Sequence, residues 1–555
     1  MAEEGIDQLE SDASEPDASS KGVGIAAVGA TLVLAACGGD DAGSPPPAAA
    51  PPPFMVVLPS RQQSSRFLAQ ATMGASRADL DQVASAGFES WLDAQFSMPR
   101  QTSHWDWLVA AGHATTATMN NQVGFDPVMW RQLIATPDQL RQRVGMALLD
   151  LLVIGIDGVN APWRQFAVAA YVDLLMDNAF GNFRTILQQV STSPAMGYYL
   201  TFLGNRKANA ATGAVPDENY ARELMQLFTI GLIRLNPDGT SQGSETYTQA
   251  DITGLARVFT GFTLDSADNS TPDRLRRPMA ITAAQHETGV KTFLGTTIPA
   301  GTSGADSLRM ALDTIFAHPN VAPFVSKQLI QRLVTSNPTP AYVGRISAVF
   351  DNNGNGARGD LRAVVRAILL DTEARSNSLV SSYGKLRVPV QRLTGWARAF
   401  NSNSPSNGWA IGDTSSTANR LGQSPGRSPS VFNFFRPGYT PPNTAIATAG
   451  LVAPEFQIAN EPSVIAYVNY MQALIAGGAG DFRADYSDIL TRAGDATTLV
   501  SEVDLLLGAQ LSAATRTSIA AAVDSIATTA VNGPLNRVYT AILLALASPD
   551  YLIQK

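Results

Sequence analysis

The helical character of the chain is clearest in Pro216–Thr240, which reads PDENYARELMQLFTIGLIRLNPDGT. Apolar and polar residues recur there at spacings of three and four, so a helix would carry each kind on its own face. This pattern predicts one amphipathic helix from Tyr220 to Ile230, with Glu218 and Arg222 paired one turn apart. The apolar face would hold Tyr220, Ala221, Leu224, Met225, Leu227, Phe228 and Gly231, and the polar row Asn219, Arg222, Glu223 and Gln226.

The same spacing continues from Ser60 to the end of the chain, and no long alternating strand pattern interrupts it. The sequence therefore predicts an all-α fold, a large multi-helix body with at most short hairpins. The hairpins are expected in two long irregular segments, Leu264–Ser307 and Asn401–Pro454, and such connections are where function tends to concentrate. Ser76 is expected to begin one helix, and Asp360 to cap another.

Composition excludes several classes of protein. The 555 residues are 45% hydrophobic and 15% charged, with a formal net charge of -8 and no run of basic residues, so a nucleic-acid partner is not expected. The single cysteine, Cys37, excludes an intrachain disulfide and a thiolate zinc site. With only four histidines, a three-histidine metal site is not expected either, and no cofactor is identified.

The N-terminal region contains an apolar stretch, Val23–Cys37, which reads VGIAAVGATLVLAAC. It is too short and too rich in glycine and alanine to span a membrane, and it is typical of the apolar core of a signal segment. Its end, Leu34-Ala35-Ala36-Cys37, resembles the bacterial lipobox, whose cysteine is acylated and becomes the new N-terminus. An ordinary export signal with an incidental cysteine is the alternative. The acidic residues before Lys21 indicate an unusual leader or a translation start further downstream.

Three segments are predicted on this basis. Residues 1–37 are a lipoprotein-type signal segment, residues 38–59 a Pro/Ala-rich extended tether, and residues 60–555 the helical domain. The protein is thus expected at the cell envelope, attached to a membrane through a lipid anchor. Gly38, directly after the cysteine, resembles the outer-membrane sorting signal.

Three motifs match a catalytic pattern but fail its chemistry. Gly422–Gly426 fits G-x-S-x-G, yet the residue after the serine is Pro425, which has no N–H for an oxyanion hole. Gly354–Gly359 fits G-x-G-x-x-G, but it follows a helical pattern where the dinucleotide fingerprint needs a strand. His286-Glu287 begins like a zincin, but Val290 stands where the second histidine is required.

Polar segments before and after the Tyr220–Ile230 helix are expected to meet its polar row in one pocket. Glu223 is expected to face inward and to pair with a cation from another segment, for which Arg206, Lys291 and Arg436 are candidates. The alternative is that the polar row faces water. The predicted pocket consists of Asn219, Arg222, Glu223, Gln226, His286, Glu287, Lys291 and Arg436.

Eight blocks carry a family resemblance, and they are Asp217–Gly231, Arg257–Phe262, His286–Gly295, His318–Val321, Gln331–Val334, Arg358–Leu361, Gly384–Arg387 and Ser430–Tyr439. In these blocks, from about Arg66 to its end, the chain resembles the bacterial family catalogued as domain of unknown function 1800. The resemblance implies a secreted or envelope protein of largely helical fold with no established reaction. Members are often encoded near an exported family similar to phosphatases and sulfatases, which suggests a partner of that kind.

The chain departs from the family at one place. Many relatives have a Trp-His-Asn-His-Phe stretch where this chain reads Leu148-Leu149-Asp150-Leu151-Leu152. A metal or acid–base role built on those two histidines therefore does not apply here.

Two functions compete at this point. The favoured one is a non-enzymatic envelope component that binds a partner protein or a polymer. The alternative is a hydrolase or lyase acting on an extracytoplasmic anionic or polymeric substrate, with Glu223 and Glu287 as acid and base. Arg222, Lys291 and Arg436 would then hold the anionic group.

The lipobox resemblance generates the first prediction. Cells that express the protein and are fed a clickable fatty acid should label it, and Cys37→Ala should abolish the label because it removes the only thiol. The label is read by in-gel fluorescence of the purified protein. Equal labelling of both proteins, or of neither, would show that Cys37 is not acylated.

Overall fold

The computed structural model describes residues 58–376 and 382–555 of the chain. It is mostly helical, with 52% helix against 6% strand, so the predicted dominance of helices is confirmed. The predicted signal segment and all but the last two residues of the predicted tether lie outside the described residues.

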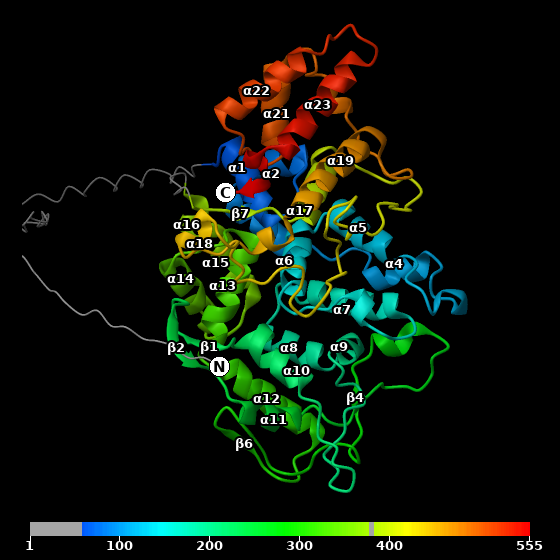
Figure 1. Cartoon of the computed structure of the whole chain (residues 1–555), viewed down its shortest axis with the longest axis vertical. Helices are drawn as coiled ribbons and strands as arrows, with labels where there is room; N and C mark the ends of the chain where they lie inside the picture. Colours follow the sequence, from blue (N-terminus) through cyan, green and yellow to red (C-terminus); the bar gives the residue numbers. More distant parts are fainter. Residues whose placement is uncertain (1–57, 377–381) are drawn as a thin grey trace, which may run out of the picture. The chain divides into compact units, whose positions relative to one another are not determined.

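Between Arg61 and Tyr199 most of the chain is helical (Figure 1). Ser76 begins α2 and Gly87 ends it, as their positions before and after the apolar periodicity predict. These helices are α1 (Arg61–Ala71), α2 (Arg77–Ala86), α3 (Phe88–Ser97), α4 (His104–Ala110), α5 (Phe125–Ala135), α6 (Gln139–Leu149), α7 (Arg164–Asp177), α8 (Phe183–Ser191) and α9 (Pro194–Tyr199), with short 3-10 turns η1 (Thr116–Thr118) and η2 (Ile156–Gly158).

The middle of the chain mixes helices with short turns. Asp360 caps α15 by accepting hydrogen bonds from the N–H groups of Arg362 and Ala363, as predicted. The helical elements here are α10 (Asn219–Glu223), η3 (Leu224–Thr229), α11 (Gln249–Ala256), η4 (Pro272–Leu275), α12 (Gly304–Ala317), α13 (Val321–Leu333), α14 (Pro340–Asp351), α15 (Leu361–Leu370) and α16 (Thr372–Arg375).

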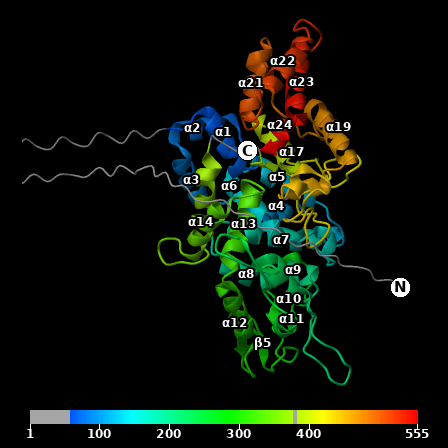
Figure 2. The ribbon, with the colours of Figure 1, turned by 60° about the vertical axis from the view of Figure 1, so that its left-hand side comes forward.

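The C-terminal part gathers a second group of helices, among which α21, α22 and α23 pack against one another (Figures 1 and 2). Within residues 401–453, all of which the structure describes, α18 is the only helix. The elements are α17 (Pro389–Ala399), α18 (Ala445–Thr448), η5 (Pro454–Ile458), α19 (Glu461–Gly477), α20 (Ser487–Leu490), α21 (Ala496–Leu506), α22 (Ala513–Asp524), α23 (Gly533–Ala547) and α24 (Pro549–Leu552).

Two apolar cores correspond to these groups. The larger core contains Leu148, Phe166 and Ile330 and unites the helices up to α15. The second contains Trp396, Val503 and further residues of α19 to α24. Helix α6 is central to the first core, since it packs against α1, α3, α5, α7 and α13.

Strands occur as four antiparallel pairs, β1–β2, β3–β4, β5–β6 and β7–β8. The expectation that they would be confined to hairpins in the two irregular segments holds fully only for β5–β6: β1–β2 and β7–β8 lie outside these segments, and β3 ends one residue before the first of them. The β1–β2 hairpin lies just after η3, where the turn Asn236-Pro237-Asp238-Gly239 reverses the chain with Gly239 at φ +76°. Strands β7 and β8 join distant parts of the chain. The strands are β1 (Ile233–Leu235), β2 (Ser241–Glu245), β3 (Phe262–Thr263), β4 (Ala280–Ile281), β5 (Lys291–Phe293), β6 (Thr296–Ile298), β7 (Lys385–Leu386) and β8 (Ile553–Gln554).

The predicted continuous helix from Tyr220 to Ile230 is also corrected. It is α-helical only in α10, and η3 is a π-helix. Thr229 stabilises the wider turn, because its hydroxyl donates to the carbonyl of Leu224 five residues earlier at 2.5 Å. The π-turn rotates the following side chains relative to an α-helical wheel. Leu227, expected on the apolar face, is consequently only half-buried.

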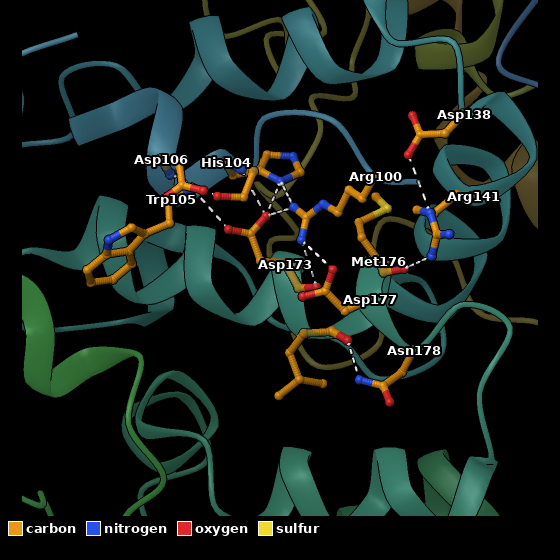
Figure 3. A network of polar contacts seen from close by, with 12 residues as sticks. Arg100, His104, Trp105, Asp106, Asp138, Arg141, Asp173, Met176, Asp177 and Asn178 are labelled. Atoms are coloured by element: carbon orange, nitrogen blue, oxygen red, sulfur yellow. Dashed lines mark hydrogen bonds and ion pairs between the residues drawn. The ribbon is translucent and has the colours of Figure 1, made fainter. Parts of the chain in front are cut away.

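A buried carboxylate fixes the start of α4 (Figure 3). Asp173 of α7 accepts hydrogen bonds from the backbone N–H groups of His104 and Trp105, each at 2.9 Å. It also contacts His104 Nδ1 at 2.7 Å and the guanidinium of Arg100. Burial alone would raise the pKa of Asp173, but His104, Arg100 and the Trp105 N–H hold it below its ordinary value.

Asp173→Asn should therefore lower the free energy of unfolding by roughly 3–5 kcal/mol at neutral pH, because Arg100 loses its buried partner. A carboxylate with a depressed pKa stabilises the fold above its ordinary pKa, and this stabilisation is lost as pH falls through the folded value. The wild type and the variant should thus converge in stability below about pH 4. Urea denaturation at a series of pH values measures the difference.

Asp177→Asn is the matched control. Asp177 contacts the same Arg100 at 2.7 Å, but 58% of its side chain is exposed. Its removal should cost about 0–1 kcal/mol. Equal losses in both variants would show that Asp173 acts as an ordinary surface partner of Arg100.

Candidate functional site

A groove with a volume of about 1110 Å³ lies in the described part of the molecule. Part of its wall comes from η3 and β1, and another part from the irregular segment 431–440 with 450–452. The floor is formed by Asp150, directly after α6, and by residues of α13. Segments far apart in the sequence therefore surround one space.

The floor is held by two arginines that cap the C-terminal ends of α6 and α13. Arg332, near the end of α13, donates from Nη2 to the carbonyl of Asp150 at 2.8 Å. Arg143 of α6 donates from Nη2 to the carbonyl of Arg332, also at 2.8 Å. Lys385 of β7 adds a second donor to that carbonyl at 2.8 Å. Cations on the unpaired carbonyls of a helix C-terminus are electrostatically favourable.

Asp150 is the only carboxylate among the residues that line the groove. Asn433 donates to its Oδ1 at 2.7 Å, and no described residue donates to Oδ2. Burial raises the pKa of Asp150, although Arg332, Asn433, Lys385 and Arg143 oppose this shift. The carboxylate thus offers one acceptor position to a ligand in the groove.

The groove also offers two cations. Lys327 and Arg436 line it, and neither forms an ion pair with another described residue. Arg436 is exposed and lies over the ring of Phe432 at 4.6 Å. Burial lowers the pKa of Lys327. With Arg332 already engaged, the free charge of the groove is positive.

Apolar side chains that reach the surface line the same groove. Leu232 is 53% exposed, Ile233 40% and Phe432 36%. Phe435 and Tyr439 add aromatic surface nearby. Apolar residues that are exposed singly need no functional explanation. A cluster of them beside free cations, in contrast, is typical of an interaction site.

Of the eight residues predicted to form one pocket, Gln226 and Arg436 line this groove. The η3 π-helix directs Gln226 toward it, together with the adjacent Leu227. Five of the other six lie in two further polar groups, and Glu223 is buried without an ion pair to any described residue, so the predicted set is not united in this groove.

One of these groups surrounds Thr260. The Thr260 hydroxyl accepts from the N–H of Glu287 at 2.8 Å, and its carbonyl contacts His286 Nδ1 at 3.0 Å. Lys291 is fully buried, and its ammonium donates to the carbonyl of Gly289 at 3.5 Å. Burial lowers the pKa of both His286 and Lys291. These contacts stabilise the chain before β5.

The second group lies where α10 packs against α11. Arg222 contacts Glu218 at 3.3 Å, which confirms the predicted pair, and it also donates to Gln249 at 3.2 Å. Asn219 donates to the carbonyl of Leu200 at 3.4 Å. The half-exposed polar row thus joins neighbouring elements on the surface.

Glu223 faces inward as predicted, with 8% exposure, but its predicted pairing is wrong. No ion pair links it to a described residue, and its Oε2 is buried without a hydrogen bond. Arg206 is exposed, and Lys291 and Arg436 make the contacts described above. Burial raises the pKa of Glu223, and the neighbouring Arg222 opposes the shift only in part.

Sequence reasoning missed Asp150, Lys327 and Phe432. Asp150 stands in the stretch where many relatives have two histidines. Without those histidines, the stretch shows no catalytic pattern that would single out the aspartate. A signal was present for Phe432, because SVFNFFRPGY places four aromatic rings and an arginine within ten residues. No local pattern pointed to Lys327, which lies on an ordinary amphipathic helix.

The family model described as protein of unknown function (DUF1800) matches residues 66–553. The chain therefore belongs to this family, as the resemblance of its sequence blocks indicated. No curated protein and no solved structure matches the chain.

Two features are absent from the described ranges. Neither 58–376 nor 382–555 contains a helix that is both long and apolar enough to cross a membrane. Within the same ranges, no cluster of three or more histidine, cysteine, aspartate or glutamate side chains is arranged to hold a metal ion.

Glu223 forms no ion pair with a described residue, so its substitution should affect stability in the opposite direction to the breaking of a buried ion pair. A carboxyl whose folded pKa is raised stabilises the fold at low pH, and that stabilisation is lost as pH rises through the folded value. Glu223→Gln should therefore leave the free energy of unfolding at pH 7 unchanged or higher. Relative to this variant, the wild type should gain stability as pH is lowered toward about 4.3.

Urea denaturation at several pH values tests this expectation. Glu218→Gln serves as the control, since Glu218 lies on the same helix start and already pairs with Arg222. A loss of roughly 3–5 kcal/mol in Glu223→Gln would mean that Glu223 has a buried cationic partner after all.

Proposed function

We propose that the protein is an exported, lipid-anchored envelope protein whose groove binds an extended polypeptide segment of a partner. The observation that carries this proposal is the combination of exposed Leu232, Ile233 and Phe432 with unpaired Lys327 and Arg436 around one groove of about 1110 Å³. The anchor rests on Cys37 and the Pro/Ala-rich residues that follow it in the sequence.

The chemistry of the walls favours a polypeptide over a carbohydrate. Aliphatic side chains such as Leu232, Ile233 and Leu451 contribute much of the lining, and these suit apolar side chains better than sugar rings. The amide nitrogen of Gln226, which donates to no described residue, supplies a donor for a peptide backbone. The free positive charge favours a segment that carries an acidic residue.

The alternative, a hydrolase or lyase that uses Glu223 and Glu287, finds less support. Neither residue lines the groove, where Asp150 is the only carboxylate. Paired-carboxylate chemistry requires two such groups on one cleft. The family resemblance suggests an exported phosphatase- or sulfatase-like protein as one candidate partner.

Selection of a phage-displayed random peptide library on the purified protein tests the proposal. We expect peptides with apolar residues beside an acidic one, and their binding should weaken as salt is raised. Leu232→Glu and Arg436→Glu should each reduce affinity by about tenfold or more, which corresponds to about 1.4 kcal/mol. Calorimetry with a synthesised peptide measures the affinity.

Val531→Glu is the control, because Val531 is 89% exposed and does not line the groove. It should leave peptide affinity unchanged. Peptides that bind all the variants equally would contradict the proposal. Retention on insoluble envelope polysaccharide that depends on Leu232 would instead identify a carbohydrate ligand.

A further inference from the structure

A second cavity, of about 260 Å³, lies among the C-terminal elements and shares no lining residue with the groove. Its walls come from the start of α17, from η5 and α19, and from the chain around α24. Most of the lining is aliphatic or aromatic, including Leu421, Phe456 and Leu552. An engineered apolar cavity of about 150 Å³ is large enough for benzene, so this one has room for a somewhat larger apolar ligand.

One charged side chain in the cavity wall has unused hydrogen-bonding capacity. Arg392 is only 7% exposed, and its Nε donates to the carbonyl of Arg387 at 2.7 Å. Its terminal nitrogens, Nη1 and Nη2, form no hydrogen bond or ion pair with any residue that the structure describes. The guanidinium lies over the ring of Tyr467 at 4.9 Å, which fixes its plane.

The only carboxylate that lines the cavity already has a cationic partner. Glu455 also lines it, but its Oε1 is paired with Lys385 at 2.9 Å, and both side chains are 3% exposed. Arg392 therefore remains as a buried cation without an anionic partner. Such a group is costly unless an anion accompanies it.

We propose that this cavity binds an aliphatic carboxylate, with the carboxylate on the terminal nitrogens of Arg392 and the hydrocarbon chain among the apolar walls. A guanidinium and a carboxylate match in geometry, and two parallel charge-assisted hydrogen bonds join them. The volume suits a chain of about eight carbons. The site is independent of the groove and of the function proposed for it.

The entrance of the cavity offers a matched pair of variants on α19. Val464 lines the cavity and is 54% exposed, so it lies at the rim. Its neighbour Ile465 is 63% exposed and does not line the cavity. Val464→Trp should obstruct the entrance, whereas Ile465→Trp changes the same surface without reaching it.

Isothermal titration of the full chain with octanoate, octanol and octylamine tests the proposal. Octanoate should bind saturably and about tenfold or more tightly than the two ligands of equal chain length, because only it carries the anion. Arg392→Gln should weaken octanoate binding by about tenfold or more, and Val464→Trp should also weaken it. Ile465→Trp should bind like the wild type.

Three outcomes would overturn the proposal. They are the absence of saturable octanoate binding, equal affinity for the three ligands, and equal effects of Val464→Trp and Ile465→Trp. Circular dichroism of each variant checks folding. If Arg392→Gln fails to fold, the comparison of ligands and the α19 pair decide the question.

Discussion

Helices α6 and α13 exchange hydrogen bonds from two arginines, and much of the structure depends on this exchange: Arg332, near the end of α13, caps the end of α6, and Arg143, within α6, caps the end of α13. Helix ends leave carbonyl groups without partners, and buried cations need compensation. Here Arg143 donates to the carbonyl of Arg332, and Arg332 donates to the carbonyl of Asp150. These hydrogen bonds thus provide partners both for the carbonyl groups at the helix ends and for the buried guanidinium groups. Because α6 packs against five other helices, fixing its end also fixes the centre of the larger core.

The same hydrogen bonds determine which side chains of the groove are free to bind a ligand. Asp150 is positioned through its own carbonyl, so its carboxylate stays at the floor with one oxygen available. Arg332 is already engaged in a hydrogen bond to the Asp150 carbonyl, so Lys327 and Arg436 are the cations that remain for a ligand. A rigid polar floor between apolar walls suits recognition of a chain with mixed apolar and acidic character, since few groups need to rearrange on binding.

Lys385 connects the groove with the apolar cavity. Its ammonium contacts the Arg332 carbonyl under the groove at 2.8 Å and Glu455 in the cavity wall at 2.9 Å. Burial lowers the pKa of Lys385, and Glu455 is the nearest group that opposes this shift. Strand β7 carries Lys385 and pairs with β8 near the C-terminus, so the second core is tied to the floor of the groove.

The sequence by itself determined the mainly helical fold, the helix starts at Ser76 and Asp360, and the pair of Glu218 with Arg222. Each of these depends on residues within about four positions of one another, where spacing decides contact. Only the tertiary structure decided that η3 forms a π-helix, that Glu223 is buried without an ion pair to any described residue, and that Asp150 and Arg436 line one groove. These features depend on which distant segments meet, and local periodicity contains no information about that.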